Sequence, residues 1–91
     1  MQVTVTEITA AFLALLNKTR TREDVSTWAS TVRAADDAEG NEYVPRSAEK
    51  AIWDALEFFM GFDMKNSPAS YLYSETDLEK YWKENKARLT V

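Results

Sequence analysis

The stretch SAEKAIWDALEFFMGF, residues 47–62, is the most apolar and aromatic run of the sequence, and it decides the expected fold. Its apolar side chains recur at the three- and four-residue spacing of one helical face, with charged residues opposite. Gly61 stands where a left-handed helix terminus favours glycine. A helix with such a wide apolar face needs neighbours on more than one side. We therefore expect the central helix of a small bundle, with a buried face that comprises Ala48, Ile52, Ala55, Leu56, Phe59 and Phe62.

Three further segments carry a helix signal. Thr4 and Glu7 match a T-x-x-E capping box, and an apolar stripe behind it predicts a helix over residues 5–18. Thr21 precedes two acidic residues, which favour the positive end of a helix over residues 22–36. Ser74 and Asp77 cap a last helix over residues 75–88, whose apolar stripe is thin. That helix is expected on the outside of the bundle.

Two longer loops separate these helices. Residues 36–46 contain Gly40-Asn41 and Pro45, and residues 63–73 contain the turn sequence Asn66-Ser67-Pro68. Residues 1–4 are expected to form a frayed extended arm. The pattern predicts an all-α fold, a compact antiparallel four-helix bundle that forms a single domain over residues 1–91.

The composition excludes several chemistries. The chain contains no cysteine and no histidine, which removes disulfides, thiolate nucleophiles, the usual general base and the commonest transition-metal ligands. No nucleophile–base pair, glycine-rich phosphate loop or metal-ligand spacing is present in the sequence. We therefore expect no catalytic residues, no metal, no cofactor and no enzymatic activity. The missing disulfide framework also favours an intracellular protein over a small secreted one.

The net charge of −4 argues against binding nucleic acid, since phosphate contacts need clustered lysine and arginine. No apolar run reaches membrane-spanning length, and the first residues lack the basic region of a signal peptide. These features predict a cytoplasmic protein without nucleic-acid or membrane partners.

Four carboxylates crowd the end of the second predicted helix, within seven residues that contain no base: Asp36, Asp37, Glu39 and Glu42. Carboxylates at a helix C-terminus face the negative end of its dipole, which costs about 0.3–1 kcal/mol each at exposed sites. One interpretation is an ordinary solvated helix end. Another is an electrostatic docking site for a basic partner. A calcium loop fits poorly, because Gly40 does not take the sixth position after an acidic first residue.

Three aromatic residues are candidate contact residues as well. Trp53 lies at the edge of the apolar stripe of the central helix, and Tyr71 and Tyr73 stand on either side of Leu72 in the second loop. Each is either packed under a neighbouring element or an interface anchor, because tryptophan and tyrosine dominate binding hot spots. The predicted partner-binding residues are Asp36, Asp37, Glu39, Glu42, Trp53, Tyr71 and Tyr73.

A small, acidic chain of four helices with acidic and tyrosine-bearing loops resembles the immunity proteins of bacteriocins and polymorphic toxins. The residues that carry the resemblance are Asp36, Asp37, Glu39, Glu42, Tyr71 and Tyr73. The colicin immunity proteins neutralise a basic nuclease toxin with acidic and aromatic residues. The resemblance therefore implies a bacterial, non-enzymatic binding protein that inhibits or shields a basic protein partner, such as a nuclease-type toxin.

Two alternatives remain at this stage. The first is a structural or homo-oligomeric helical assembly module, which would show a concentration-dependent oligomer with little effect of salt. The second is a small enzyme, which the absence of histidine and cysteine disfavours. The sequence leaves the oligomeric state open.

Overall fold

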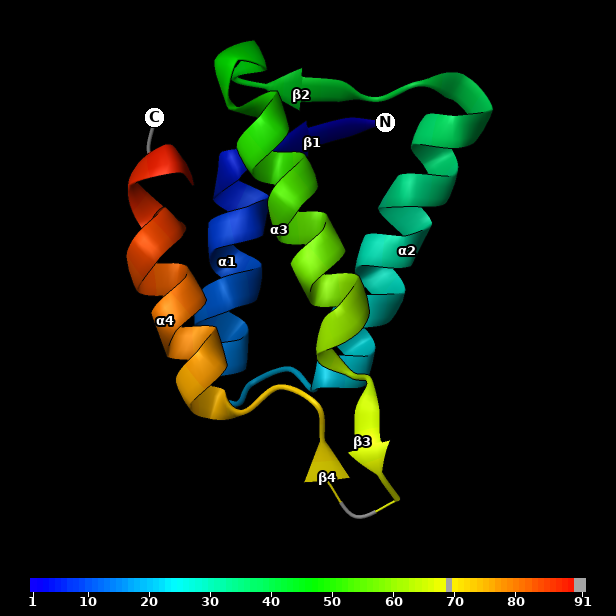
Figure 1. Ribbon diagram of the computed structural model, residues 1–91. Coiled ribbons are helices and arrows are strands. Elements are labelled where there is room, and N and C mark those ends of the chain that lie inside the picture. Colours follow the sequence, from blue (N-terminus) through cyan, green and yellow to red (C-terminus); the bar gives the residue numbers. More distant parts are fainter. Residues whose placement is uncertain (69, 90–91) are drawn as a thin grey trace.

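Four α-helices carry most of the chain in the computed structural model, which describes residues 1–68 and 70–89 (Figure 1). Consecutive helices run in opposite directions, and α3 lies between α1 and α2 (Figure 1). There are two short 3-10 helices: η1 directly precedes α3, and η2 directly follows α4. The predicted helices are confirmed, with shifted ends: α1 Val5–Leu16, α2 Arg22–Glu39, η1 Arg46–Ala48, α3 Glu49–Phe62, α4 Glu75–Asn85 and η2 Lys86–Leu89.

Short polar side chains start the helices as the sequence predicts. The Thr4 hydroxyl accepts a hydrogen bond from the Glu7 N–H at 3.1 Å, and Glu7 reaches back to the Thr4 N–H. Ser74 and Asp77 make the same reciprocal pair at the start of α4. The backbone N–H of Ser74, and then its side chain, hold the pKa of Asp77 below its ordinary value. These caps satisfy N–H groups that the first turn of a helix leaves unpaired.

The expected all-α class is confirmed in part, because the fold is mostly helical but also contains two small sheets. Residues 1–4 are not a frayed arm, because β1 (Gln2–Thr4) pairs in parallel with β2 (Glu42–Val44). The side chains of Val3 and Tyr43 are buried, and pairing satisfies the backbone groups beside them. A second, antiparallel pair joins β3 (Lys65–Ser67) to β4 (Ser70–Tyr71) and projects below the helices (Figure 1).

The core is organised around α3, as its sequence predicts. Phe59 is fully buried, and its ring centroid lies 4.6 Å from that of Phe12 on α1 and 6.4 Å from that of Trp28 on α2. From α4, Trp82 packs against the ring of Phe12 at 5.0 Å. The buried face of α3 therefore touches α2 and Phe12, and Phe12 carries the contact on to α4.

The glycine that ends a helix with a positive φ is Gly40, and not Gly61. Gly61 lies inside the last turn of α3, whose C-cap is Asp63. Gly40 has a φ of 77°, and its N–H donates to the Asp36 carbonyl at 2.8 Å. A side chain at that φ would be strained, so glycine lets α2 stop and the chain turn toward β2. Within the described residues, no helix is long and apolar enough to cross a membrane.

Replacing Phe59 by alanine tests the central position of α3. The substitution removes a fully buried ring, so we expect the free energy of unfolding in urea to fall by about 3–5 kcal/mol. Leu13→Ala is the matched control, because Leu13 is an apolar α1 side chain that is 44% exposed. A loss at Phe59 no larger than at Leu13 would contradict the packing described here.

Candidate functional site

The acidic cluster is divided between a structural residue and three exposed ones. Asp36 is half-buried, and its Oδ1 accepts hydrogen bonds from the Asn41 N–H at 2.9 Å and from the Tyr43 hydroxyl at 3.2 Å. Asp36 therefore closes the loop between α2 and β2, which offsets its unfavourable place at a helix C-terminus. The exposed carboxylates of the cluster are Asp37, Glu39 and Glu42.

Trp53 packs at the boundary of the core. Its ring lies 6.0 Å from that of Tyr43, and the guanidinium of Arg33 lies 4.4 Å above it. Arg33 also approaches Glu57 at 3.8 Å. Trp53 is thus half-buried and held between α2 and β2. This is the packing interpretation of the residue, while its predicted role as an interface anchor stays untested.

Tyr71 and Tyr73 lie far from the acidic cluster. The acidic cluster spans the end of α2 and the start of β2, at one end of the molecule. Tyr71 and Tyr73 lie on and just after β4, in the hairpin that β3 and β4 form at the other end (Figure 1). The structure therefore does not bring the predicted contact residues together on one surface. The carboxylate beside the hairpin is Glu23, which accepts from the Tyr71 hydroxyl at 2.9 Å. This hydrogen bond is the main reason that the pKa of Tyr71 is raised above its ordinary value.

Arg22 holds the hairpin, and the sequence analysis did not identify it. Its guanidinium lies over the rings of Phe62 and Tyr71 at 4.0 and 4.1 Å, and it donates to the carbonyls of Phe62 and Tyr73. The sequence does contain a signal, because an arginine in the first turn of a helix opposes the helix dipole. Such a residue is expected to find its partners outside its own helix.

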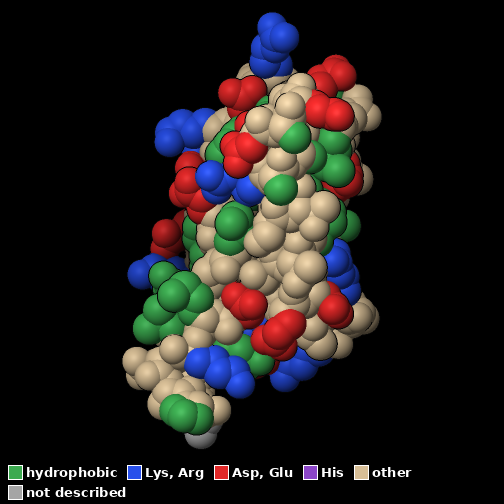
Figure 2. All heavy atoms as spheres, turned by 90° about the vertical axis from the view of Figure 1, so that its right-hand side faces the viewer, with side chains coloured by type: hydrophobic (Ala, Val, Ile, Leu, Met, Phe, Trp, Pro, Cys, Tyr) green, Lys and Arg blue, Asp and Glu red, His purple; other side chains and the backbone are tan. Residues whose placement is uncertain are grey.

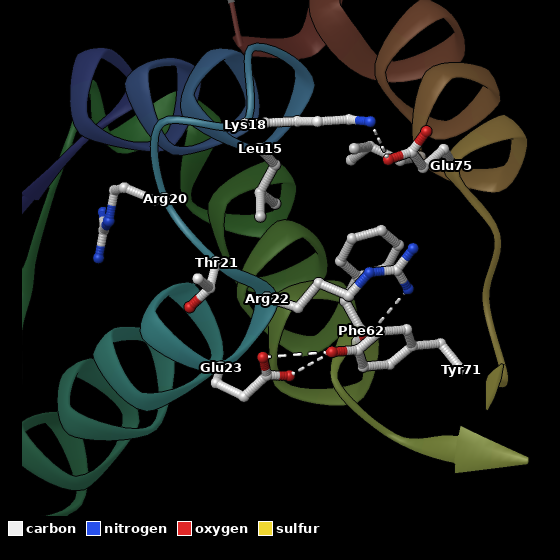
Figure 3. Close-up of a pocket in the computed structure, with 10 residues that line it drawn as sticks. Leu15, Lys18, Arg20, Thr21, Arg22, Glu23, Phe62, Tyr71 and Glu75 are labelled. Atoms are coloured by element: carbon white, nitrogen blue, oxygen red, sulfur yellow. Dashed lines mark hydrogen bonds and ion pairs between the residues drawn. The ribbon is translucent and has the colours of Figure 1, made fainter. Parts of the chain in front are cut away.

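The α1–α2 joint, the hairpin and the start of α4 enclose a pocket of about 250 Å³ (Figure 3). Several of the charged side chains that line the pocket already have a partner among the other lining residues. Lys18 forms a 3.1 Å ion pair with Glu75 across the rim, and Glu23 is occupied by Tyr71. The guanidinium of Arg20 points away from these groups (Figure 3). The cations at this end of the molecule are therefore mostly engaged in holding the hairpin and α4 in place.

Charge is separated between the two outer helices, which lie on opposite sides of the molecule (Figure 1). On α2, five carboxylates stand against two arginines. Carboxylates gather near both ends of the α2 side, with few charges between them (Figure 2). Across α4 and η2, residues 75–89, four cations stand against four carboxylates, Glu75, Asp77, Glu79 and Glu84. This side of the molecule therefore balances its charges, whereas α2 is acidic, and its cations lie toward its C-terminal end: Lys80, Lys83, Lys86 and Arg88.

Comparison with known proteins identifies the family. A family model described as "YxzC DNA-binding protein" matches residues 2–85. A relative named "Uncharacterized protein YxzC", from Bacillus subtilis (strain 168), is 38% identical over 71 residues. The match includes 78% of this chain and 52% of the relative, so the chain spans about half the length of that curated protein. No solved structure matches. The chain belongs to the YxzC DNA-binding protein family.

Family membership overturns several sequence-based expectations. The resemblance to immunity proteins was misleading, because the matching family is described as DNA-binding. A basic protein partner and the assembly-module alternative lack support for the same reason. The exclusion of nucleic acid, which rested on the net charge of −4 and on the lack of clustered lysine and arginine, is contradicted by the description of the family as DNA-binding. The net charge is a sum over the whole protein surface, whereas a DNA phosphate interacts mainly with protein charges that lie within about one Debye length of it.

Substitution of Arg22 tests how the hairpin is held. Arg22→Ala removes two carbonyl hydrogen bonds and two ring contacts, so we expect stability to fall by about 2 kcal/mol. Amide hydrogen exchange should accelerate selectively across residues 64–73. Arg20→Ala is the control, because the guanidinium of Arg20 is exposed and 5.9 Å from the ring of Trp28. Equal effects of the two variants would contradict the assigned role.

Proposed function

We propose that this protein is a non-enzymatic DNA-binding protein of the cytoplasm, and that its four helices form an antiparallel bundle that presents α4 to DNA. The observation that carries the assignment is the contrast between α2, where five carboxylates stand against two arginines, and α4 with η2, where the charges balance and the cations lie toward the C-terminal end. The description of the matching family as a DNA-binding protein supports it. The contact residues are Lys80 and Lys83 on α4 and Lys86 at the start of η2, which together we call the basic stripe.

The basic stripe follows from the helical spacing of its residues. Positions three apart on an α-helix step sideways by about 60°, so the three lysines slant across the exposed side of α4 and into η2. Their side chains are exposed. The residues that anchor α4, chiefly Leu78 and Trp82, point the other way and pack against the core. Docking of the thin apolar stripe thus leaves the cations at the surface.

The ion pairs on this side do not prevent the lysines from reaching a phosphate. Lys80 lies 4.0 Å from Glu84, and both side chains are more than half exposed, at 75% and 60%. Exposed pairs of this kind contribute at most about 1 kcal/mol and are screened by salt. A phosphate can therefore replace Glu84 as the partner of Lys80 at little cost.

The chemistry of the stripe fits contacts to the backbone of DNA. Lysine is a flexible point charge that binds phosphate without reading a base edge. The amide of Asn85, which is suited to base recognition, is occupied because it donates to the Tyr81 carbonyl at 2.9 Å. We therefore infer binding with little sequence preference and a dissociation constant of about 10⁻⁴–10⁻⁶ M at physiological salt.

Fluorescence anisotropy with a labelled duplex oligonucleotide tests this proposal. With three lysine–phosphate contacts, a plot of log affinity against log salt should have a slope of about −3. Lys83→Ala should reduce that slope by about one and weaken binding equally for unrelated sequences. Lys65→Ala is the matched control, because Lys65 is an exposed lysine on β3, outside the basic stripe.

Two results would overturn the assignment of α4. One is the absence of salt-dependent binding to any duplex. The other is an equal loss of affinity for Lys83→Ala and Lys65→Ala, which would mean that binding depends on overall charge and not on α4.

A further inference from the structure

A hollow of about 340 Å³ opens beside the basic stripe, between α3, α4 and the base of the hairpin. Its volume lies within the range of small-molecule sites, about 300–1,000 Å³. Four of its residues come from one side of α4, at the positions i, i+3, i+4 and i+7. The lining comprises Phe58, Tyr73, Asp77, Lys80, Tyr81 and Glu84.

Three aromatic rings form the wall of this hollow. Phe58 and Tyr81 are stacked, with centroids 4.2 Å apart and an angle of 19° between their planes. Tyr73 lies 6.0 Å from Phe58 and is 38% exposed. Phe58 in turn stacks on Phe62, a core residue, with their centroids 5.2 Å apart, so the aromatic wall packs directly against the core. A supported aromatic wall that reaches the surface offers a flat planar ligand a place to stack.

Polar groups surround the rings on the α4 side. Lys80 supplies a cation, and Asp77 and Glu84 supply carboxylates that accept hydrogen bonds. Asp77 is fixed by its hydrogen bond from the Ser74 N–H at 2.8 Å. Burial raises the pKa of Tyr81 above its ordinary value. The rim thus provides donors and acceptors around an apolar wall, the combination that a nucleobase edge requires.

We propose that this hollow binds an unpaired nucleobase, and that single-stranded or locally unpaired DNA is the preferred ligand of the protein. The inference rests on the proposed function and names its ligand class. Lys80 belongs to both sites, since it is part of the basic stripe and lines the hollow. A phosphate held at Lys80 therefore places the adjoining base beside the rings.

Duplex DNA cannot use this hollow without disruption, because its bases are paired and stacked inside the helix. A single strand has no such restraint, and stacking on aromatic side chains contributes to binding independently of sequence. Single strands should consequently gain the ring contacts in addition to the phosphate contacts of the basic stripe. Duplexes should gain only the latter.

The test compares a single-stranded oligonucleotide with its duplex, using anisotropy for affinity and a 2-aminopurine base in the strand as a stacking probe. Wild-type protein should bind the single strand more tightly and quench the 2-aminopurine. Tyr73→Leu keeps an apolar contact with Phe58 but removes a flat ring, so single-strand affinity should fall about tenfold while duplex affinity is unchanged. Tyr73→Phe should retain wild-type binding.

The outcomes separate this inference from the proposed function. Binding to neither DNA overturns both. Duplex binding that depends on Lys83, with no single-strand preference and no effect of Tyr73→Leu, overturns the base site alone. The backbone carbonyl of Tyr73 carries the hydrogen bond from Arg22, so the side-chain variants leave the hold on the hairpin intact. Urea unfolding of each variant checks this, and Tyr71→Phe, which removes the hydroxyl bound to Glu23, serves as a second hairpin control.

Discussion

Packing of the Phe59 ring against Phe12 is the contact on which the arrangement of the helices depends. The two centroids lie 4.6 Å apart inside a core that α3 shares with α1 and α2. Once this pair is buried, α4 has only one way to hide its thin apolar stripe, which is against Phe12 and Phe58 through Tyr81 and Trp82. The opposite side of α4 must then face solvent, so the lysines on that side are exposed. The surface proposed to bind DNA is therefore a consequence of how the core is filled.

On the proposed function, the placement of the carboxylates of α2 away from α4 lets an acidic protein approach DNA. The molecule extends over 38 × 29 × 20 Å, whereas the Debye length at physiological salt is about 8 Å. Carboxylates on the α2 side are consequently screened from a phosphate backbone lying against α4. In the proposed binding mode, these carboxylates repel DNA that comes close to the α2 side, which favours encounters with α4 in front. Arg88 forms a 2.8 Å ion pair with Asp54 on α3. It therefore holds the end of the chain after α4 against α3, and we do not count it among the proposed DNA contacts.

Capping residues and helical periodicity can be read from neighbouring positions in the sequence, so the helices were predictable. Elements without such a signal were missed. Capping at Thr4, Thr21 and Ser74, together with helical periodicity, placed all four helices within a few residues. The β1–β2 pair was missed because Val3 and Tyr43 are far apart in the sequence and become neighbours only in the folded chain. Residues 2–4 do alternate polar and apolar side chains, but a run of this length is too short to distinguish a strand.

The candidate site was predicted less well for a related reason. Asp36 was interpreted as a docking carboxylate because its partners, Asn41 and Tyr43, are visible only in three dimensions. The alternation of Glu79, Lys80, Lys83 and Glu84 along the chain suggested an ordinary solvated face. In the fold, that face lies on the other side of the molecule from the acidic α2 (Figure 1), and the sequence alone does not reveal this separation of the lysines from the carboxylates of α2.

Chemical-shift mapping with a short oligonucleotide tests the central claim, that DNA lies against α4 and away from α2, most directly. In an amide ¹H–¹⁵N spectrum, the account predicts that residues 77–88 shift on titration and that residues 34–42 do not. Shifts confined to the α1–α2 joint and the hairpin, or spread evenly over the surface, would contradict it.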